Sequence, residues 1–425
     1  MKLWKDSDRG AAQELVSWLL STIEDSGGWS IDWVNMIAVD ELPALSSQPD
    51  SVKSLFNQTL REMKDKQKRT LDDFEAIFEV SLKAMKASSR SQSTTTWQFF
   101  IPINVHVAYT LIKAKPRVRI LGKVFSFTPL KTVERRLGKN GSETLRNRSL
   151  LRIRTRTKLS EVPSIFLVTS ANGSSWHDAW KEVESAFDAL RGMIELTFDF
   201  FGFRLISEDQ GARCSVPHPL WMIAHQPALD TPEWIHFITD EDSDSKPFEL
   251  TSKRLIGIQK NSAILAKKPK DGTTLSLIAN CLRLYSQAMD ARFRHLSFLG
   301  FWQLAEAITN AETFGGKTDR VVGRLAWHGA RIGLKGSGYR GILGRLAAKR
   351  NAIVHRGMHD IRHDDINAIK FACEAALDWL FREHKSLPTI LHIEQYYRLR
   401  EMSNSDIAAI DVTITRLKKA RRSAK

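Results

Sequence analysis

The feature that most constrains the fold is a long helical pattern, without strand signals, in the second half of the chain. From residue 273 to 383, apolar residues recur three and four positions apart, the period of an amphipathic α-helix. The predicted helices span 273–290, 293–310, 319–332, 339–356 and 364–383. Two further helical stretches are expected after Pro388. The pattern therefore predicts a helical bundle in this half of the chain.

The first part of the chain mixes helical and strand periods. Helices are predicted at 12–24, 71–86 and 174–195, and alternating apolar residues predict strands at 101–107, 116–121 and 151–157. The charged, Lys-, Pro- and Gly-containing stretch 240–272 predicts a domain boundary. We therefore expect the α+β class, with an N-terminal mixed α/β domain at 1–260 and a C-terminal all-α helical bundle with a basic tail at 261–425.

The charge of the chain predicts a polyanionic partner. The net charge is +15 over 425 residues, and residues 111–160 alone carry fifteen Lys and Arg against two Glu. A second basic cluster runs from Arg416 to Lys425. The two-residue period of a strand puts alternate arginines of the 111–160 segment on one face, opposite an apolar face. The arginines expected to bind the polyanionic partner in this way are Arg117, Arg119, Arg152, Arg154 and Arg156.

Composition sets further limits. With 42% hydrophobic and 26% charged residues the chain is expected to fold, and no apolar run approaches the ~18 residues of a membrane span. The first ten residues contain no apolar segment typical of a secretion signal, so we expect a cytoplasmic protein that does not associate with membranes. Three scattered cysteines predict neither a disulfide framework nor a Cys-based zinc site.

Three short motifs imitate ligand sites. Residues 336–341 match G-x-G-x-x-G, but helical spacing precedes them where a dinucleotide site requires a strand. Residues 315–318 resemble the end of a phosphate-binding loop, but its first glycine is missing. Histidines recur four residues apart in 355–363, but Gly357 interrupts the helix that would align them. We therefore expect neither a metal nor a cofactor.

One arginine lies where the helix 339–356 should be apolar. At 100° per residue, Arg350 falls near the centre of the apolar stripe. The stripe consists of Leu343, Leu346, Ala347, Ile353 and Val354. A buried guanidinium is costly unless it is paired, so Arg350 needs an acidic partner or faces a cleft that receives an anion. Glu306, the only charged residue of 296–310, is the candidate partner. In the alternative interpretation, Glu306 and Arg350 form a structural ion pair and His355 stabilises the last carbonyls of the helix.

Two more residues of this helix have side chains suited to a catalytic site. Asn351 and His355 are one turn apart, so the amide can orient the imidazole. Arg350 and His355 are about 140° apart on an ideal helix. They converge on one phosphate only if the helix ends between them, with Gly357 suggesting an end soon after His355, or if a second copy of the chain completes the site.

At these residues the sequence resembles a known family. "RNAIVH" at 350–355 is similar to the R-x4–6-H signature, often beginning Arg-Asn, of the HEPN superfamily. The surrounding helices, including "FLGFWQLAEAI" with its acidic residue, resemble most the Apea-like HEPN proteins of bacterial anti-phage defence. The resemblance covers roughly 260–385 and leaves residues 1–260 unexplained. It implies a helical bundle and a metal-independent ribonuclease. It also implies a homodimer with the motifs at its interface, acting on tRNA or other RNA in abortive infection.

The residue types fit that chemistry. Metal-independent RNA cleavage requires proton transfer, for which His355 is the candidate, and stabilisation of charge on the phosphorus, for which Arg350 is the candidate. Asn351 would orient these groups and Glu306 would support them, while a second proton-transfer group is not identified. We therefore expect an RNA endonuclease, with a phage-derived protein as a candidate activator. The alternative is a non-catalytic protein that binds nucleic acid or a partner through its arginine-bearing strands.

Overall fold

The structure is a computed structural model with two compact units, Met1–Thr94 and Thr95–Lys425. It describes scattered residues between 10 and 63, and then 70–91, 95–103, 105–107, 116–146, 165–199, 216, 221–227, 232–236, 248–291, 293–309, 318–334, 337–357 and 360–423. In the first unit, α5 (Leu71–Ser91) confirms the helix predicted at 71–86 and extends beyond it. Phe74 and Phe78 of α5 are buried and their rings stack. Most of the helix predicted at 12–24 lies outside the described residues.

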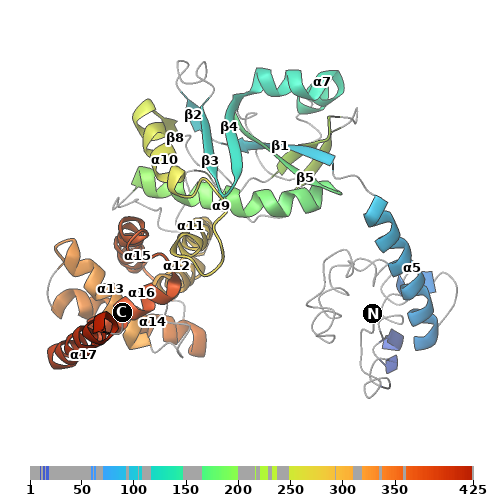
Figure 1. The fold of residues 1–425 in the computed structure, drawn as a ribbon. Coiled ribbons are helices and arrows are strands. Elements are labelled where there is room, and N and C mark those ends of the chain that lie inside the picture. Colours follow the sequence, from blue (N-terminus) through green and yellow to red (C-terminus); the bar gives the residue numbers. More distant parts are fainter. Residues whose placement is uncertain are drawn as a thin grey trace. The chain divides into compact units, whose positions relative to one another are not determined.

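The second unit begins with a six-stranded antiparallel sheet (Figure 1). Its strands, in spatial order, are β3 (Arg117–Ile120), β4 (Lys123–Pro129), β5 (Ile165–Gly173), β1 (Thr95–Ile103), β6 (Trp221–His225) and β7 (Glu233–His236). A separate parallel pair joins β2 (Val105–Val107) to β8 (Phe248–Leu250).

Helices cover both faces of the sheet. The helix α9 (Trp176–Asp199), predicted at 174–195, packs on one face, where Phe99 of β1 lies 5.4 Å from the ring of Trp180. On the other face, α7 (Leu130–Arg146) packs against Phe100 of β1. Because both faces are covered, consecutive residues in the middle of β1 are buried. The alternation predicted at 101–107 therefore applies only to the end of β1 and to β2.

The edge strand β3 confirms the two-residue period predicted at 116–121. Arg117 and Arg119 are exposed, whereas Val118 and Ile120 are buried in the core. A two-residue turn, Leu121–Gly122, with positive φ at both positions joins β3 to β4, as in a tight hairpin. The strand predicted at 151–157, with Arg152, Arg154 and Arg156, lies outside the described residues.

Beyond residue 272 each of the predicted helices is present, and the described residues there form one isolated bridge but no strand. They are α11 (Thr274–Asp290), α12 (Arg294–Thr309), α13 (Thr318–Arg331), α14 (Ser337–Arg356), α15 (His363–Glu383), α16 (Ile390–Glu401) and α17 (Asn404–Ser423). The chain therefore has the mixed α+β architecture that the sequence predicts. Among the described helices, none combines the length and the apolar character needed to cross a membrane.

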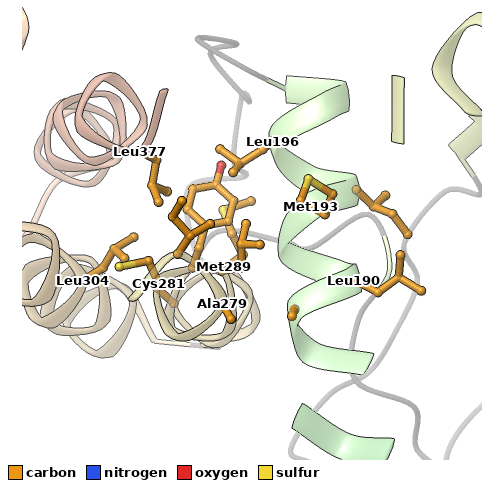
Figure 2. Close-up of a cluster of buried hydrophobic side chains, with 14 of the residues drawn as sticks. Leu190, Met193, Leu196, Ala279, Cys281, Met289, Leu304 and Leu377 are labelled. Atoms are coloured by element: carbon orange, nitrogen blue, oxygen red, sulfur yellow. The ribbon is translucent and has the colours of Figure 1, made fainter. Parts of the chain in front are cut away.

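The sheet and the bundle share one hydrophobic core. Figure 2 shows Leu196 of α9 in the same cluster of buried side chains as Met289 of α11 and Leu377 of α15. The boundary predicted at 260/261 falls inside α10 (Ser252–Ile264). The composition change at 240–272 therefore does not coincide with a break in the packing.

A glycine and a buried arginine join α9 to α11. A Cβ on Gly192 would lie 2.1 Å from the carbonyl oxygen of Leu282. The two backbones are therefore closer than any residue with a side chain would allow at this position. Beside it, Arg191 is fully buried and forms ion pairs with Asp188 and Asp290. These contacts hold α9, which packs on the sheet, against α11, the first helix of the bundle.

Candidate active site

The helix that carries the motif is continuous through all its predicted site residues. α14 runs from Ser337 to Arg356, and Gly357 ends it with a φ of 64°. The amide of Gly357 donates to the carbonyl of Ile353 at 3.1 Å, which is the capping bond of a left-handed C-terminal residue. Since the helix does not end between Arg350 and His355, the two side chains leave it in directions about 140° apart.

Arg350 occupies the centre of the buried arc of α14, as predicted. Leu343, Leu346, Ala347 and Ile353 of the predicted stripe are buried. Val354, predicted to belong to the stripe, is 52% exposed, because the helix ends two residues later. The side chain of Arg350 remains 27% exposed, so its guanidinium lies between the bundle and solvent.

The guanidinium is held from two sides. Its Nη2 donates to Oε1 of Glu306 on α12 at 3.3 Å, which confirms the predicted pairing, and its Nη1 donates to Oδ1 of Asn351 at 3.2 Å. The indole of Trp302 donates to the same oxygen of Glu306 at 2.8 Å. A guanidinium has five N–H donors, and within the described residues only two of these have partners. The remaining donors match the oxygens of a phosphate.

Asn351 lies between Arg350 and His355 rather than serving His355 alone. On the helix it is about 100° from Arg350 and about 40° from His355. Its bond to Arg350 draws the guanidinium towards the edge of α14 on which His355 lies. His355 is exposed, and its ring makes no hydrogen bond within the described part of the chain, so the predicted contact with Asn351 is not present. The imidazole is therefore open to a ligand or to another chain.

Lys349 was not identified from the sequence, yet it fixes the end of α14. Its Nζ lies 2.6 Å from Oδ2 of Asp365 and 3.1 Å from the carbonyl oxygen of Asp360. Asp365 is buried and also accepts from the backbone amide of Arg362, which caps the start of α15. The lysine thus joins the site helix to the N-terminus of the next helix. The sequence contained one indication of this contact, because Asp365 lies in the first turn of a predicted helix, where an acidic side chain can cap the helix.

The strand β3 and the helix α7 carry a second group of exposed basic residues. Arg117 and Arg119 are exposed on β3, and α7 adds exposed residues that the sequence analysis did not single out. These are Lys131, Arg135 and Arg136. None of these five side chains forms an ion pair with a described residue, whereas Lys123 is paired with Glu182 at 2.6 Å. The five therefore present unneutralised positive charge to solvent.

The motifs set aside from the sequence lie in helical surroundings. Gly338 and Gly341 belong to α14, and the element before them is α13, so no strand precedes the glycine motif. His363 begins α15, His359 lies outside the described residues, and so does Gly336. Within the described residues no group of three His, Cys, Asp or Glu side chains is arranged to bind a metal.

A network of charged and polar side chains, most of them buried, joins α13 to α16 elsewhere in the bundle and has a structural role. Arg324 of α13 donates to Glu394 and Glu401 of α16 at 2.9 and 2.7 Å. Nearby, Nε2 of His328 lies 2.7 Å from the hydroxyl of Tyr397, and burial lowers the pKa of His328 to about 3. A histidine with that pKa is neutral near pH 7, and its charge does not change there. This network anchors α16 to α13 rather than forming a reactive site.

Comparison with protein-family models, with curated proteins and with solved structures gave no match to this chain. The interpretation of the site therefore depends on its geometry and on the motif.

Proposed function

We propose that this chain is a cytoplasmic, metal-independent RNA endonuclease of the HEPN type that acts on tRNA or other RNA in anti-phage abortive infection. The observation that carries the proposal is the state of Arg350. Arg350 is the first residue of the R-x4-H motif and forms one hydrogen bond to a carboxylate, that of Glu306. It has further N–H donors that do not take part in this bond. A purely structural arginine at the centre of a buried arc is expected to have its donors satisfied, because desolvation is repaid only then, whereas Arg350 has donors without a partner among the described residues.

The proposed reaction is an attack of the ribose 2′-OH on the adjacent phosphorus. The 2′-oxygen loses its proton, the bond to the 5′-oxygen of the next nucleotide breaks, and that oxygen takes up a proton. The products are a 2′,3′-cyclic phosphate and a 5′-hydroxyl. Arg350 binds the phosphate oxygens and stabilises the charge that develops on them. His355 transfers a proton, Asn351 orients the guanidinium, and Glu306 holds it on the other side.

The exposed face of α14 supports a homodimer. Gly341, Gly344, Ala348 and Ala352 lie on one side of the helix, in the same arc as His355. A Cβ added to Gly341 or Gly344 would meet no described atom within 4 Å. Small side chains let two helices approach closely, so a second α14 related by a two-fold axis fits this face. Such pairing would bring His355 of one chain towards the edge on which Arg350 of the other is exposed.

The basic surface on β3 and α7 supports RNA as the substrate. RNA is a polyanion, and exposed arginines bind its phosphates without reading its sequence. We propose that Arg117 and Arg119 bind the RNA backbone together with Arg152, Arg154 and Arg156. A phage-derived activator protein remains part of the proposal. Co-expression with a panel of phage genes tests it through growth arrest that depends on His355.

The activity is tested by incubating purified protein with total RNA in EDTA. The wild-type chain should produce fragments, and His355→Ala should not. His177→Ala removes another exposed histidine, on α9, and should cleave like the wild type. Cleavage by a folded His355→Ala protein would contradict the role of this residue.

A second function is favoured by one observation, the sharing of one Glu306 oxygen between two donors from different helices. This carboxylate accepts from both Arg350 and Trp302, as it would in a structural bridge between α12 and α14. In that case the chain binds nucleic acid without cleaving it. RNA binding with no fragments, in the presence and absence of co-expressed phage proteins, would support this alternative.

A further inference from the structure

The last described helix, α17, stands apart from the packing of the bundle. Ser403 caps it, because its Oγ accepts from the amide of Asp406 at 3.2 Å and donates to the Asp406 carboxylate at 2.6 Å. From Asn404 to Leu417 every side chain is exposed except that of Ile410, which is partly buried. The described side chains of that stretch make no hydrogen bond to another element. Isolated helices of this length are marginally stable in water, so a partner would stabilise α17.

Four apolar residues form a narrow stripe along α17. Ile407, Ile410, Ile414 and Leu417 follow one another at spacings of three, four and three residues. They fall within about 80° of the helix circumference, which is narrower than the stripe of a helix that packs into a globular core. Ile407, Ile414 and Leu417 are 40%, 43% and 58% exposed. This spacing is that of the a and d positions of a coiled coil, whose partner is another helix with the same stripe.

The charges of α17 select the orientation of that partner. Its first half carries Asp406 and Asp411, and its second half carries five basic residues. These are Arg416, Lys418, Lys419, Arg421 and Arg422. Two parallel copies would place the basic halves side by side, which is repulsive. Two antiparallel copies would place each basic half beside the acidic half of the other, and their helix dipoles would also be opposed.

Polyanionic partners, such as RNA or an anionic membrane, fit this helix less well than a second copy of α17. RNA bound along the basic half would leave Ile407 and Ile410, at the acidic end, in contact with water. An anionic bilayer would be repelled by Asp406 and Asp411, and α17 contains no aromatic residue of the kind that anchors helices at membrane surfaces. A second α17 would cover the apolar stripe and would also place opposite charges beside each other.

We propose that two copies of this chain associate through α17, with their helices antiparallel. The register that uses all four apolar residues places Ile410 of each chain opposite Ile414 of the other, and Ile407 opposite Leu417. The two-fold axis then passes between the central pairs. This contact is separate from the α14 face and does not depend on the proposed ribonuclease activity.

The test measures the mass of the chain by sedimentation equilibrium, with the α14 face blocked. Ala348 is exposed, and Ala348→Arg places a long charged side chain where α14 pairing would occur. In this background the chain should have the mass of two copies. Adding Ile410→Glu and Ile414→Glu should halve the mass. Adding Val412→Glu instead should leave it unchanged, because Val412 is 52% exposed on the opposite side of α17.

Two outcomes would overturn the proposal. One is a single-chain mass for the Ala348→Arg chain, and the other is a two-chain mass that survives Ile410→Glu with Ile414→Glu. Circular dichroism of each variant confirms that the bundle is folded.

Cysteine cross-linking tests the orientation. In a Cys214→Ser background, chains with Ile410→Cys are mixed with chains with Ile414→Cys and oxidised. Cys281 and Cys373 are buried and serve as unreactive internal controls. The antiparallel arrangement predicts cross-links between the two kinds of chain, because the two positions face each other. Predominant cross-links between identical Ile410→Cys chains would show a parallel pair and overturn the proposed orientation.

Discussion

Arg350 combines partial burial with solvent access, so the effect of removing it separates the proposed catalytic role from a structural one. Exposed or half-exposed ion pairs contribute about 0–1 kcal/mol. Arg350→Ala should therefore lower the free energy of unfolding by about 1 kcal/mol while abolishing RNA cleavage. Urea denaturation and a cleavage assay measure the two effects on the same preparation. Arg345→Ala, an exposed arginine on the same helix, should change neither substantially.

The opposite result would favour the structural ion pair. Removing one partner of a buried, fully satisfied pair costs about 3–5 kcal/mol. A loss of that size in Arg350→Ala, with cleavage retained by the remaining folded protein, would show that Arg350 and Glu306 hold α14 against α12 and do no chemistry.

At the scale of single residues the sequence predicted positions better than contacts. Helical periodicity located Arg350 in the buried arc, and the lone charge of 296–310 identified Glu306 as its partner. It did not predict that Asn351 would bond to Arg350 instead of His355, because adjacent residues point about 100° apart on a helix and are not expected to meet, whereas residues one turn apart are. Val354 was placed in the buried stripe because periodicity alone does not show how far burial continues towards the end of the helix.

The basic edge strand is tested by the salt dependence of RNA binding. Each phosphate contact contributes roughly one unit to the slope of log affinity against log salt, and somewhat less for single strands. Replacing Arg117 and Arg119 by Gln should lower the slope by about one to two units and weaken binding to all sequences. Lys123→Gln is the control, because Lys123 is paired with Glu182. An unchanged slope would mean that β3 faces something other than RNA.

The same measurement extends to the second arginine cluster. Arg152, Arg154 and Arg156 stay a prediction, since they lie outside the described residues. Their replacement by Gln should flatten the slope further if they contact phosphates.

The packing of α9 on α11 predicts opposite effects for two glycines. A Cβ at Gly192 would lie 2.1 Å from Leu282 of the facing helix, so Gly192→Ala should destabilise the protein by about 1–3 kcal/mol. Gly323, inside α13, has no described atom within 4 Å of its ideal Cβ. Gly323→Ala should therefore stabilise by about 0.5–1 kcal/mol, because alanine favours the helix. Thermal unfolding measures both, and equal effects would contradict the close contact.

The elements that the sequence predicted are those with one buried face. The helices from α11 to α15 have such faces, and their bounds agree within about two residues with those predicted. β5 (Ile165–Gly173) was missed because its first five residues are all buried, which removes the alternation that identifies a strand. α7 was missed because Gly138 breaks it and its surface is highly charged. α10 lies in charged sequence that resembled a linker.

At the scale of the whole molecule, the separation of Arg350 and His355 on one straight helix predicts a site shared between chains. Arg350→Ala and His355→Ala proteins are each expected to be inactive. Co-expressed, they form a heterodimer in which one site contains an intact arginine from one chain and an intact histidine from the other. Partial cleavage should therefore return, and it is measured on the purified mixed dimer.

A mixed dimer that exchanges subunits yet stays inactive would show that each site is built within one chain. A chain that is monomeric at working concentration by light scattering would remove the premise of a shared site. In both cases His355 would have to reach a phosphate held by the Arg350 of its own helix.

The ends of the RNA fragments test the central claim most directly. In EDTA, the wild-type chain should leave a 2′,3′-cyclic phosphate or 3′-phosphate on one fragment and a 5′-hydroxyl on the other, because the 2′-oxygen is the nucleophile. Mass spectrometry of fragments from a defined RNA identifies these ends, and His355→Ala should give none. Fragments with 3′-hydroxyl and 5′-phosphate ends, or cyclic ends produced equally by folded His355→Ala, would contradict the account.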